Sequence, residues 1–287
     1  MDPSQGSVSS VEAAPSTNNP TTVPRIRFQT AELLAQEISK APGDILYVED
    51  VSPHDFSAID KYREDHRRKY RFRRYYPERS LLIIAITKLY HEVSHVTLYQ
   101  DIVYKFSEMG LRNHWVSTGG ATFEQEGDGK LGSGEADSTG CPIEPGRRCL
   151  LRWPMLVIET GYSQSLQQLR DDSKWWFEES NHQVKIVVLI KLHTGPLGKM
   201  TVEQWRERPI DSSSGQLEPV YQQVIDIAQI SATANRTLPL SYSVTESALE
   251  LKFSDLFLRD PGHGEGNIVI EIEDLQGLAA HIGHSNF

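Results

Sequence analysis

The 287-residue sequence has few cysteines, no long apolar run and no basic-then-apolar leader segment. Its two cysteines, Cys141 and Cys149, form neither a disulfide framework nor a zinc-binding pattern, so we expect two reduced thiols. The longest apolar runs, 81–86 and 184–190, are too short to cross a bilayer. These absences predict a soluble intracellular protein without a membrane partner, and they do not decide between nucleus and cytoplasm.

Internal repeats and a Gly-rich phosphate loop are also missing. Residues 1–24 lack large apolar side chains almost entirely and are rich in Ser, Thr, Pro and Asn. Such a segment cannot bury enough apolar surface to offset its conformational entropy, so we expect a disordered tail. The remaining length is enough to bury a proper core.

Positive charge is scarce overall, because the net charge is −10, but it is unevenly distributed. Segment 61–80 alternates basic residues with Tyr and Phe. Arginines can neutralise phosphates and rings can stack on bases, which favours a nucleic-acid-binding arm at the end of a helical preface, 25–80. The alternative is a solvated helix paired with its own acids. The candidate phosphate-binding residues are Arg67, Arg68, Lys69, Arg71, Arg73 and Arg74.

Beyond the preface, hydrophobic periodicity predicts a core at 81–206. A long helix at 80–111 ends at Gly110. The elements expected after it are a strand at 114–125, a Gly-rich turn that enters a short strand at 126–140, a strand at 153–159, a helix at 163–180, and strands at 182–193 and 199–206.

This order predicts an α/β or α+β fold, with a mixed sheet flanked by helices and with the second helix joining parallel strands. The segment 207–287 reads as an extension packed on the core. It begins with a helix-like run at 221–230 and continues with short strands.

Two acids stand at matching places in the predicted sheet. Asp137 ends a Gly-rich strand, and Glu159 follows the apolar run Met155 to Ile158. If the strands are hairpin neighbours, both carboxylates can share Mg²⁺ or Mn²⁺, and Lys174 on the next helix can stabilise developing charge. Each residue also has a purely structural interpretation: Asp137 can form a turn, Glu159 can face solvent at the strand end, and Lys174 can be a solvated surface lysine.

These residues resemble the PD-(D/E)XK nuclease superfamily, which has the restriction-endonuclease-like fold with an α-β-β-β-α-β core. Residues 135–137 occupy the position of the family's Pro-Asp motif, and residues 158–161 occupy the position of its Glu-x-Lys motif. Gly161 departs from the pattern by replacing the Lys. In a bacterial branch of the superfamily the Lys lies on the next helix, and Ser163, Asp172 and Lys174 are similar to that arrangement.

The resemblance covers about 80–206, and 153–176 also resembles a group of uncharacterised fungal proteins. It implies a metal-dependent nuclease that hydrolyses nucleic-acid phosphodiesters, with Asp137 and Glu159 as metal ligands and Lys174 as their cation. Lys191 is the other conceivable cation, and Glu92 could add a third carboxylate.

Two other functions stay open. A catalytically inactive relative could bind nucleic acid or protein, which the loss of Lys at Gly161 favours. Alternatively His91, Glu92 and His95 match the zinc motif H-E-x-x-H, in which the Glu is a general base. A serine hydrolase is excluded, because 161–165 does not complete G-x-S-x-G. Trp175 and Trp176 are expected in the core.

Overall fold

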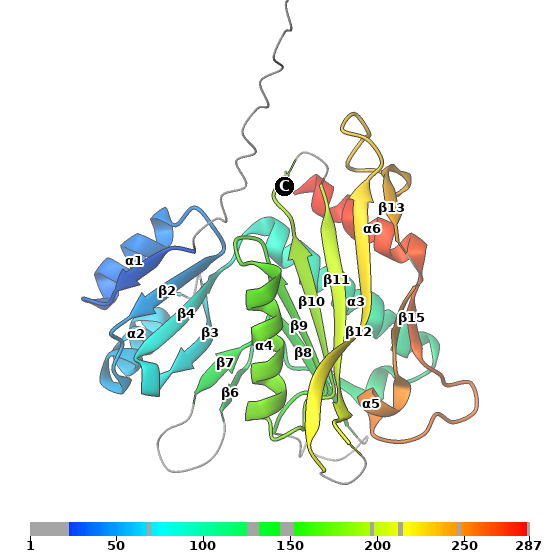
Figure 1. Cartoon of the computed structure of the whole chain (residues 1–287), viewed down its shortest axis with the longest axis horizontal. Helices are drawn as coiled ribbons and strands as arrows, with labels where there is room; N and C mark the ends of the chain where they lie inside the picture. Colours follow the sequence, from blue (N-terminus) through cyan, green and yellow to red (C-terminus); the bar gives the residue numbers. More distant parts are fainter. Residues whose placement is uncertain are drawn as a thin grey trace, which may run out of the picture.

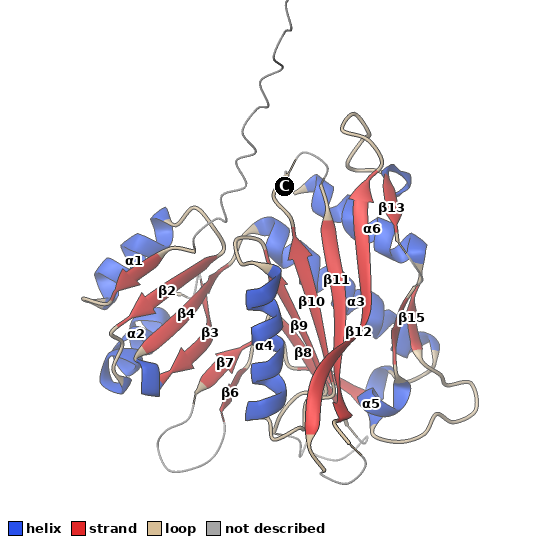
Figure 2. Ribbon diagram, viewed as in Figure 1, coloured by secondary structure: helices blue, strands red, loops and turns tan. Residues whose placement is uncertain are grey.

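A computed structural model gives the fold of the chain (Figures 1 and 2). It describes residues 23–67, 70–124, 132–143, 152–195, 198–211, 215–245 and 248–285. Almost all of the expected tail 1–24 lies outside this part, as do Arg68, Lys69 and Cys149. The other cysteine, Cys141, is buried. Sheets and helices combine as expected for a mixed α/β fold, so the predicted class is confirmed.

A mixed sheet with two helices lies at the left of Figure 1. Its order is β1-β2-β4-β3-β7-β6, with β1 parallel to β2 and the other pairs antiparallel. Thr30 caps the first helix, and Ser52 begins the second with a capping box. The elements are β1 (Arg25–Arg27), α1 (Ala31–Lys40), β2 (Ile45–Glu49), α2 (Pro53–Asp65), β3 (Tyr70–Tyr76), the 3₁₀ turn Pro77–Arg79, β4 (Leu81–Ile86), β6 (Thr122–Glu124) and β7 (Ser133–Glu135).

The larger sheet has the order β13-β12-β11-β10-β9-β8-β5. β9 and β10 are parallel and are joined by α4, as predicted, and the other pairs are antiparallel. The elements are α3 (Leu89–Glu108), the 3₁₀ turn Arg112–His114, β5 (Trp115–Ser117), β8 (Ser138–Pro142), β9 (Leu156–Gly161), α4 (Leu166–Glu179), β10 (Ile186–Leu192), β11 (Met200–Pro209), β12 (Leu217–Gln229), the 3₁₀ turn Pro239–Ser241 and β13 (Tyr242–Val244).

Helices cover both faces of the larger sheet (Figure 1). Alternate residues of β9 face opposite layers: Ile158 packs in the cluster that contains Ile102 of α3, whereas Val157 packs with Trp176 of α4. Trp175 and Trp176 are buried, which confirms their expected place in the core. The order helix, three strands, helix, strand occurs as α3, β5, β8, β9, α4 and β10, while β6 and β7 join the other sheet.

Two expected helical regions are partly strand. The predicted helix 80–111 begins only at Leu89, because the apolar run 81–86 pairs on both sides and is therefore the central strand β4. The helix ends as predicted, with Gly110 at a φ of 76°. The preface 25–80 is not wholly helical either, because its basic and aromatic segment forms β3.

The segment 207–287 adds β12 and β13 to the larger sheet, while its strands β14 (Leu249–Leu251) and β15 (Ile268–Ile270) pair with each other in a separate two-stranded sheet. The run 221–230, expected to be helical, lies in the long strand β12, where Ile225 and Ile227 are buried at a spacing of two. The remaining elements are α5 (Phe253–Phe257) and α6 (Ile272–His284), and α6 packs on α3. Among the described helices, none has the length and apolarity needed to span a membrane.

Candidate functional site

Glu159 lies inside the molecule, with none of its surface exposed. The Trp176 indole N–H donates to Glu159 Oε1 at 2.8 Å, and Arg74 Nη2 donates to the same oxygen at 3.0 Å. Arg73 Nη2 lies 3.4 Å from Oε2. The acid therefore follows a buried apolar run because its partners are buried with it, since an unpaired carboxylate would be very costly there.

Arg73 connects several oxygens around this acid. Its Nε donates to Asp172 Oδ2 at 2.9 Å, and its Nη1 donates to the Thr160 carbonyl at 3.0 Å. Burial by itself would lower the pKa of Arg73, but the charges of Glu159 and Asp172 raise it. One guanidinium thus contacts two carboxylates and a carbonyl, the kind of oxygen donors that a hard cation such as Mg²⁺ prefers.

Asp137 is also buried, immediately before β8. It accepts hydrogen bonds from the Thr160 N–H at 2.7 Å and from Arg71 Nη1 at 2.9 Å, and His91 Nε2 lies 3.3 Å away. Burial tends to raise the pKa of Asp137, but His91, His95 and Arg73 together outweigh it and hold that pKa well below its usual range. Burial likewise opposes the charge on His91, and Asp137 raises its pKa to about 10.

The structure brings the two predicted acids onto neighbouring strands but surrounds each with its own cations. Ser138 pairs with Ile158 in the β8–β9 register, so Asp137 and Glu159 are neighbours as predicted. Lys174 was expected to be their cation. Its ammonium instead pairs with Asp171 at 3.4 Å on the exposed side of α4, while arginines contact the acids. The role predicted for Lys174 is therefore corrected.

The missing Lys of the motif has a structural explanation. A Cβ on Gly161 would lie 3.0 Å from Leu169 Cδ2, so the α4 side chain fills the space that a residue 161 side chain would need. Lys191 is the register partner of Gly161 on β10 and donates to the Tyr162 carbonyl. Burial lowers its pKa to about 8. In the sequence, the pairing of the two apolar strands 153–159 and 182–193 was the signal that would have favoured Lys191 over Lys174 as the cation near residue 161.

Three residues of the predicted nucleic-acid-binding arm are turned away from the surface. Arg73 and Arg74 are at most 1% exposed, and the Arg71 side chain is 19% exposed and paired with acids. These three cannot neutralise a phosphate backbone from the interior, because they follow β3 into the space between the sheets. Arg67 is exposed, and Arg68 and Lys69 lie outside the described residues.

The H-E-x-x-H stretch lies on the first turns of α3. His91 Nδ1 and His95 Nε2 lie 3.6 Å and 3.4 Å from Glu92 Oε1. Both oxygens of Glu92 also accept from Arg71 Nη2 at 2.9 Å. Burial would raise the pKa of Glu92, but the nearby imidazoles of His91 and His95 and the charge of Arg71 lower it strongly. Glu92 therefore faces two ring nitrogens and one guanidinium at the start of α3.

A groove of about 510 Å³ lies between α3 and the strand β5. Tyr104 and Val96 are its exposed apolar residues on the helix, and Arg112 is the charged member of its described lining. Within the described residues β5 pairs with β8 alone, so in that part of the chain no strand pairs with its other edge. The lining consists of Val96, Tyr99, Gln100, Val103, Tyr104, Ser107, Arg112, Ser117, Gly119 and Ser138.

The sequence was compared with protein-family models and with curated proteins. No protein-family model matches the chain, and no curated protein matches it significantly. The assignment of a function therefore depends on the residues described above.

Proposed function

We propose that this protein is a PD-(D/E)XK-like domain in which an arginine takes the place of the metal ion, and that it acts as a protein-binding module. The observation that carries the proposal is the position of Arg73. Its guanidinium contacts Glu159, Asp172 and the Thr160 carbonyl. An internal cation that is covalently part of the chain can balance the acids without supplying a metal-bound water for hydrolysis.

The charges around the acids support an internal neutralisation. Glu159 faces Arg73 and Arg74, while Asp137 faces Arg71 and His91. A Mg²⁺ ion shared by the two acids would have to displace Arg74, which among the described residues pairs with no carboxylate other than Glu159. That displacement would leave a cation in the interior without its carboxylate partner, which is costly.

The proposed partner is a protein segment that enters the groove between α3 and β5. Val96 and Tyr104 offer exposed apolar surface, and a partner strand can add to the edge of β5 away from β8. Arg112 gives the groove a positive charge at one place. The chemistry therefore suits an extended apolar peptide that carries an acidic residue.

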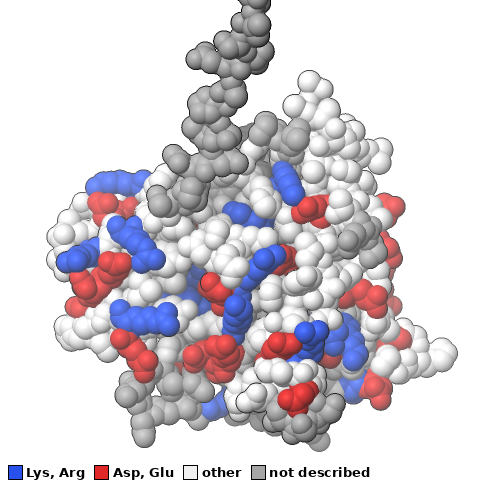
Figure 3. Space-filling model, in the orientation of Figure 1, with Lys and Arg blue, Asp and Glu red and all other residues white. Residues whose placement is uncertain are grey.

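A nucleic acid fits this surface less well. Of the described residues that line the groove, Arg112 alone is charged, and Arg73 and Arg74 are turned inside. On the face drawn in Figure 3, basic and acidic side chains lie intermixed rather than in a basic stripe. Binding to a nucleic-acid backbone needs several accessible cations, because the affinity for nucleic acid comes mostly from neutralising its phosphates.

A metal titration with a plasmid-nicking assay tests the loss of nuclease chemistry. Wild-type protein is expected to bind neither Mg²⁺ nor Mn²⁺ in calorimetry and to leave the plasmid intact. Binding with nicking, both abolished by Asp137→Asn and Glu159→Gln in folded protein, would instead establish the metal-dependent nuclease.

Peptide display and fluorescence polarisation test the groove. Peptides selected against the wild type should be apolar with an acidic residue, and Arg112→Glu should weaken them at least tenfold, about 1.4 kcal/mol. Replacing the peptide's acid by Lys should restore binding to Arg112→Glu. Leu240→Ser is the matched control, because Leu240 is 84% exposed and outside the groove. Equal binding by all three proteins would refute this site.

A further inference from the structure

Each histidine in the first turns of α3 presents one ring nitrogen to Glu92 and the other to a different partner. His91 uses Nδ1 towards Glu92 and Nε2 towards Asp137, at 3.3 Å. His95 uses Nε2 towards Glu92 and Nδ1 towards Ser138 Oγ, at 2.8 Å. The rings are nearly perpendicular, with an interplanar angle of 73°.

From this geometry we propose that His91 Nδ1, Glu92 Oε1 and His95 Nε2 bind a transition-metal ion of the Zn²⁺ class. One donor atom from each residue lies within 4.8 Å of the others. Around a tetrahedral Zn²⁺ with bonds of about 2.0–2.1 Å, neighbouring donors are about 3.3 Å apart. The distances of 3.6 Å and 3.4 Å to Glu92 are close to that value, and the two ring nitrogens, which lie within 4.8 Å of each other, have to approach to it when the ion binds.

The unsatisfied hydrogen-bonding capacity of the rings is independent support. His91 and His95 are 1% and 2% exposed. Within the described part of the chain, three ring nitrogens, His91 Nδ1, His91 Nε2 and His95 Nε2, have no hydrogen-bond partner, and two of them, His91 Nδ1 and His95 Nε2, face Glu92. Buried polar atoms in folded proteins nearly always have partners, so two such nitrogens facing one carboxylate indicate a missing ligand.

The surroundings hold the ligands as metal sites usually do. Asp137 and Ser138 contact the ring nitrogens that face away from the proposed ion and so fix each ring's orientation. Arg71 contacts both oxygens of Glu92, and it can keep Oε2 when the ion takes Oε1. The ion takes the place of the proton on His91, as metal binding to histidine requires.

The donor set selects the class of metal. Two imidazoles and one carboxylate suit Zn²⁺, Co²⁺ or Ni²⁺, whereas Mg²⁺ prefers oxygen alone. The Glu92 side chain is 34% exposed, so a fourth position can be filled by water or by a partner's group. The site differs from the H-E-x-x-H motif in that the Glu is a ligand. It does not depend on the proposed function, which concerns Arg73 and the groove.

Calorimetry with Zn²⁺ and absorption spectroscopy with Co²⁺ test the proposal on full-length protein treated with chelator and then freed of it. We expect one equivalent of Zn²⁺ to bind and Co²⁺ to give intense visible bands typical of tetrahedral coordination. Zn²⁺ should also raise the melting temperature, because it binds the folded state. Absence of Zn²⁺ binding by folded wild-type protein would overturn the proposal.

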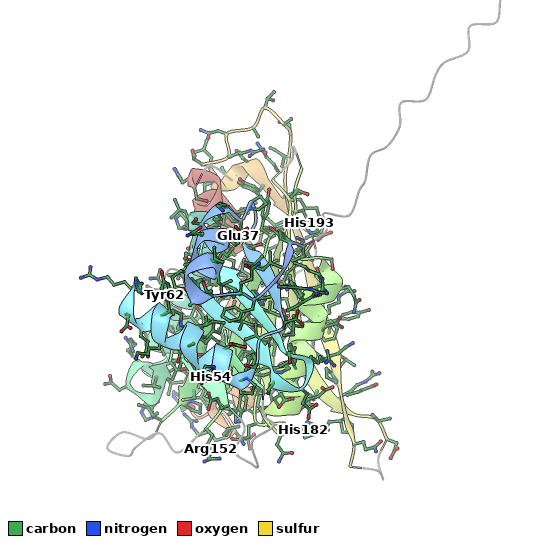
Figure 4. The ribbon with its side chains drawn as sticks, turned by 90° about the vertical axis from the view of Figure 1, so that its left-hand side faces the viewer. Glu37, His54, Tyr62, Arg152, His182 and His193 are labelled. Atoms are coloured by element: carbon green, nitrogen blue, oxygen red, sulfur yellow. The ribbon has the colours of Figure 1, made fainter. Side chains whose placement is uncertain are left out.

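Variants distinguish this site from adventitious surface binding. Glu92→Gln preserves the side-chain shape at a partly exposed position and should weaken Zn²⁺ at least tenfold, and His95→Asn should abolish the Co²⁺ bands. His54→Asn is the matched control, because His54 on α2 is 95% exposed (Figure 4) and should leave both signals unchanged. If Glu92→Gln is folded and binds Zn²⁺ as the wild type does, the site is refuted.

Discussion

Glu159 is the first carboxylate after the apolar run of β9. It shows how buried partners stabilise a charge inside a protein. Its oxygens contact Arg73, Arg74 and the Trp176 indole, and none of its surface reaches water. Such a group specifies a unique arrangement, because every alternative packing leaves a charge without a partner. The same residue therefore looks like a metal ligand in the sequence and a structural acid in the fold.

Glu159→Gln should lower the free energy of unfolding by about 3–5 kcal/mol, because it leaves buried guanidinium charge uncompensated. Asp171→Asn is the matched control. It removes an exposed pair with Lys174 and should change stability by less than about 1 kcal/mol. Urea unfolding of the two variants measures the difference. Equal stabilities would show that the buried pairs contribute nothing net.

Lys191 gives a pH-dependent prediction. Its folded pKa is about 8, below the value of 10.5 for free Lys, so the unfolded chain holds the proton more tightly. The burial penalty is fully present below pH 8 and disappears as pH rises to about 10.5. Lys191→Met should thus add about 1 kcal/mol of stability at pH 7, after allowance for solvent screening, and nothing near pH 10.5. Lys174→Met, at an exposed site, should show no such trend in parallel denaturation curves.

At the scale of elements, contact between β9 and α4 determines which motif residues the sheet can hold. Gly161→Ala places a Cβ 3.0 Å from Leu169, and we expect a loss of about 1–3 kcal/mol. Leu169→Ala in the same chain should recover part of the loss, measured as a coupling in a double-mutant cycle. Gly266→Ala is the control, since nothing lies within 4 Å of its Cβ. Additive effects would contradict direct contact between these positions.

The sequence predicted elements best where local signals and tertiary environment agree. The helix after Ser165 has a capping box, and the parallel arrangement of β9 and β10 follows from the helix between them. Predictions were wrong where the partner was distant in the chain. The segment of Arg71 to Arg74 reads as a surface helix or arm, because its acid partners on β9, α3 and α4 are 21 to 99 residues away.

The candidate site was predictable only in part for the same reason. Asp137 and Glu159 were placed on neighbouring strands from their spacing alone, and the register supports that placement. The arginines that contact these acids come from β3, which belongs to the other sheet. No local sequence pattern indicates that β3 lies beside them. The groove likewise joins a helix face to a sheet edge, and each half alone looks like ordinary surface.

For the whole molecule, the ion pairs of β3 join the smaller sheet to the larger one. Arg73 and Arg74 belong to the first sheet, whereas Glu159 lies on β9 and Asp172 on α4. Because these partners are buried, loss of one acid should weaken the contact between the sheets along its whole length. The two sheets are therefore expected to unfold together in the wild type.

Hydrogen exchange followed by mass spectrometry can measure this coupling. In Glu159→Gln, peptides from β2, β3 and β4 should lose protection together, and by more than peptides from β11 and β12, because the first sheet can then open separately. Glu265→Gln, which removes a pair with Arg259 in the loop before β15 and outside both sheets, should leave the pattern unchanged. Equal loss in both sheets would show that they remain one cooperative unit. In that case apolar packing, rather than the arginines of β3, would be what joins them.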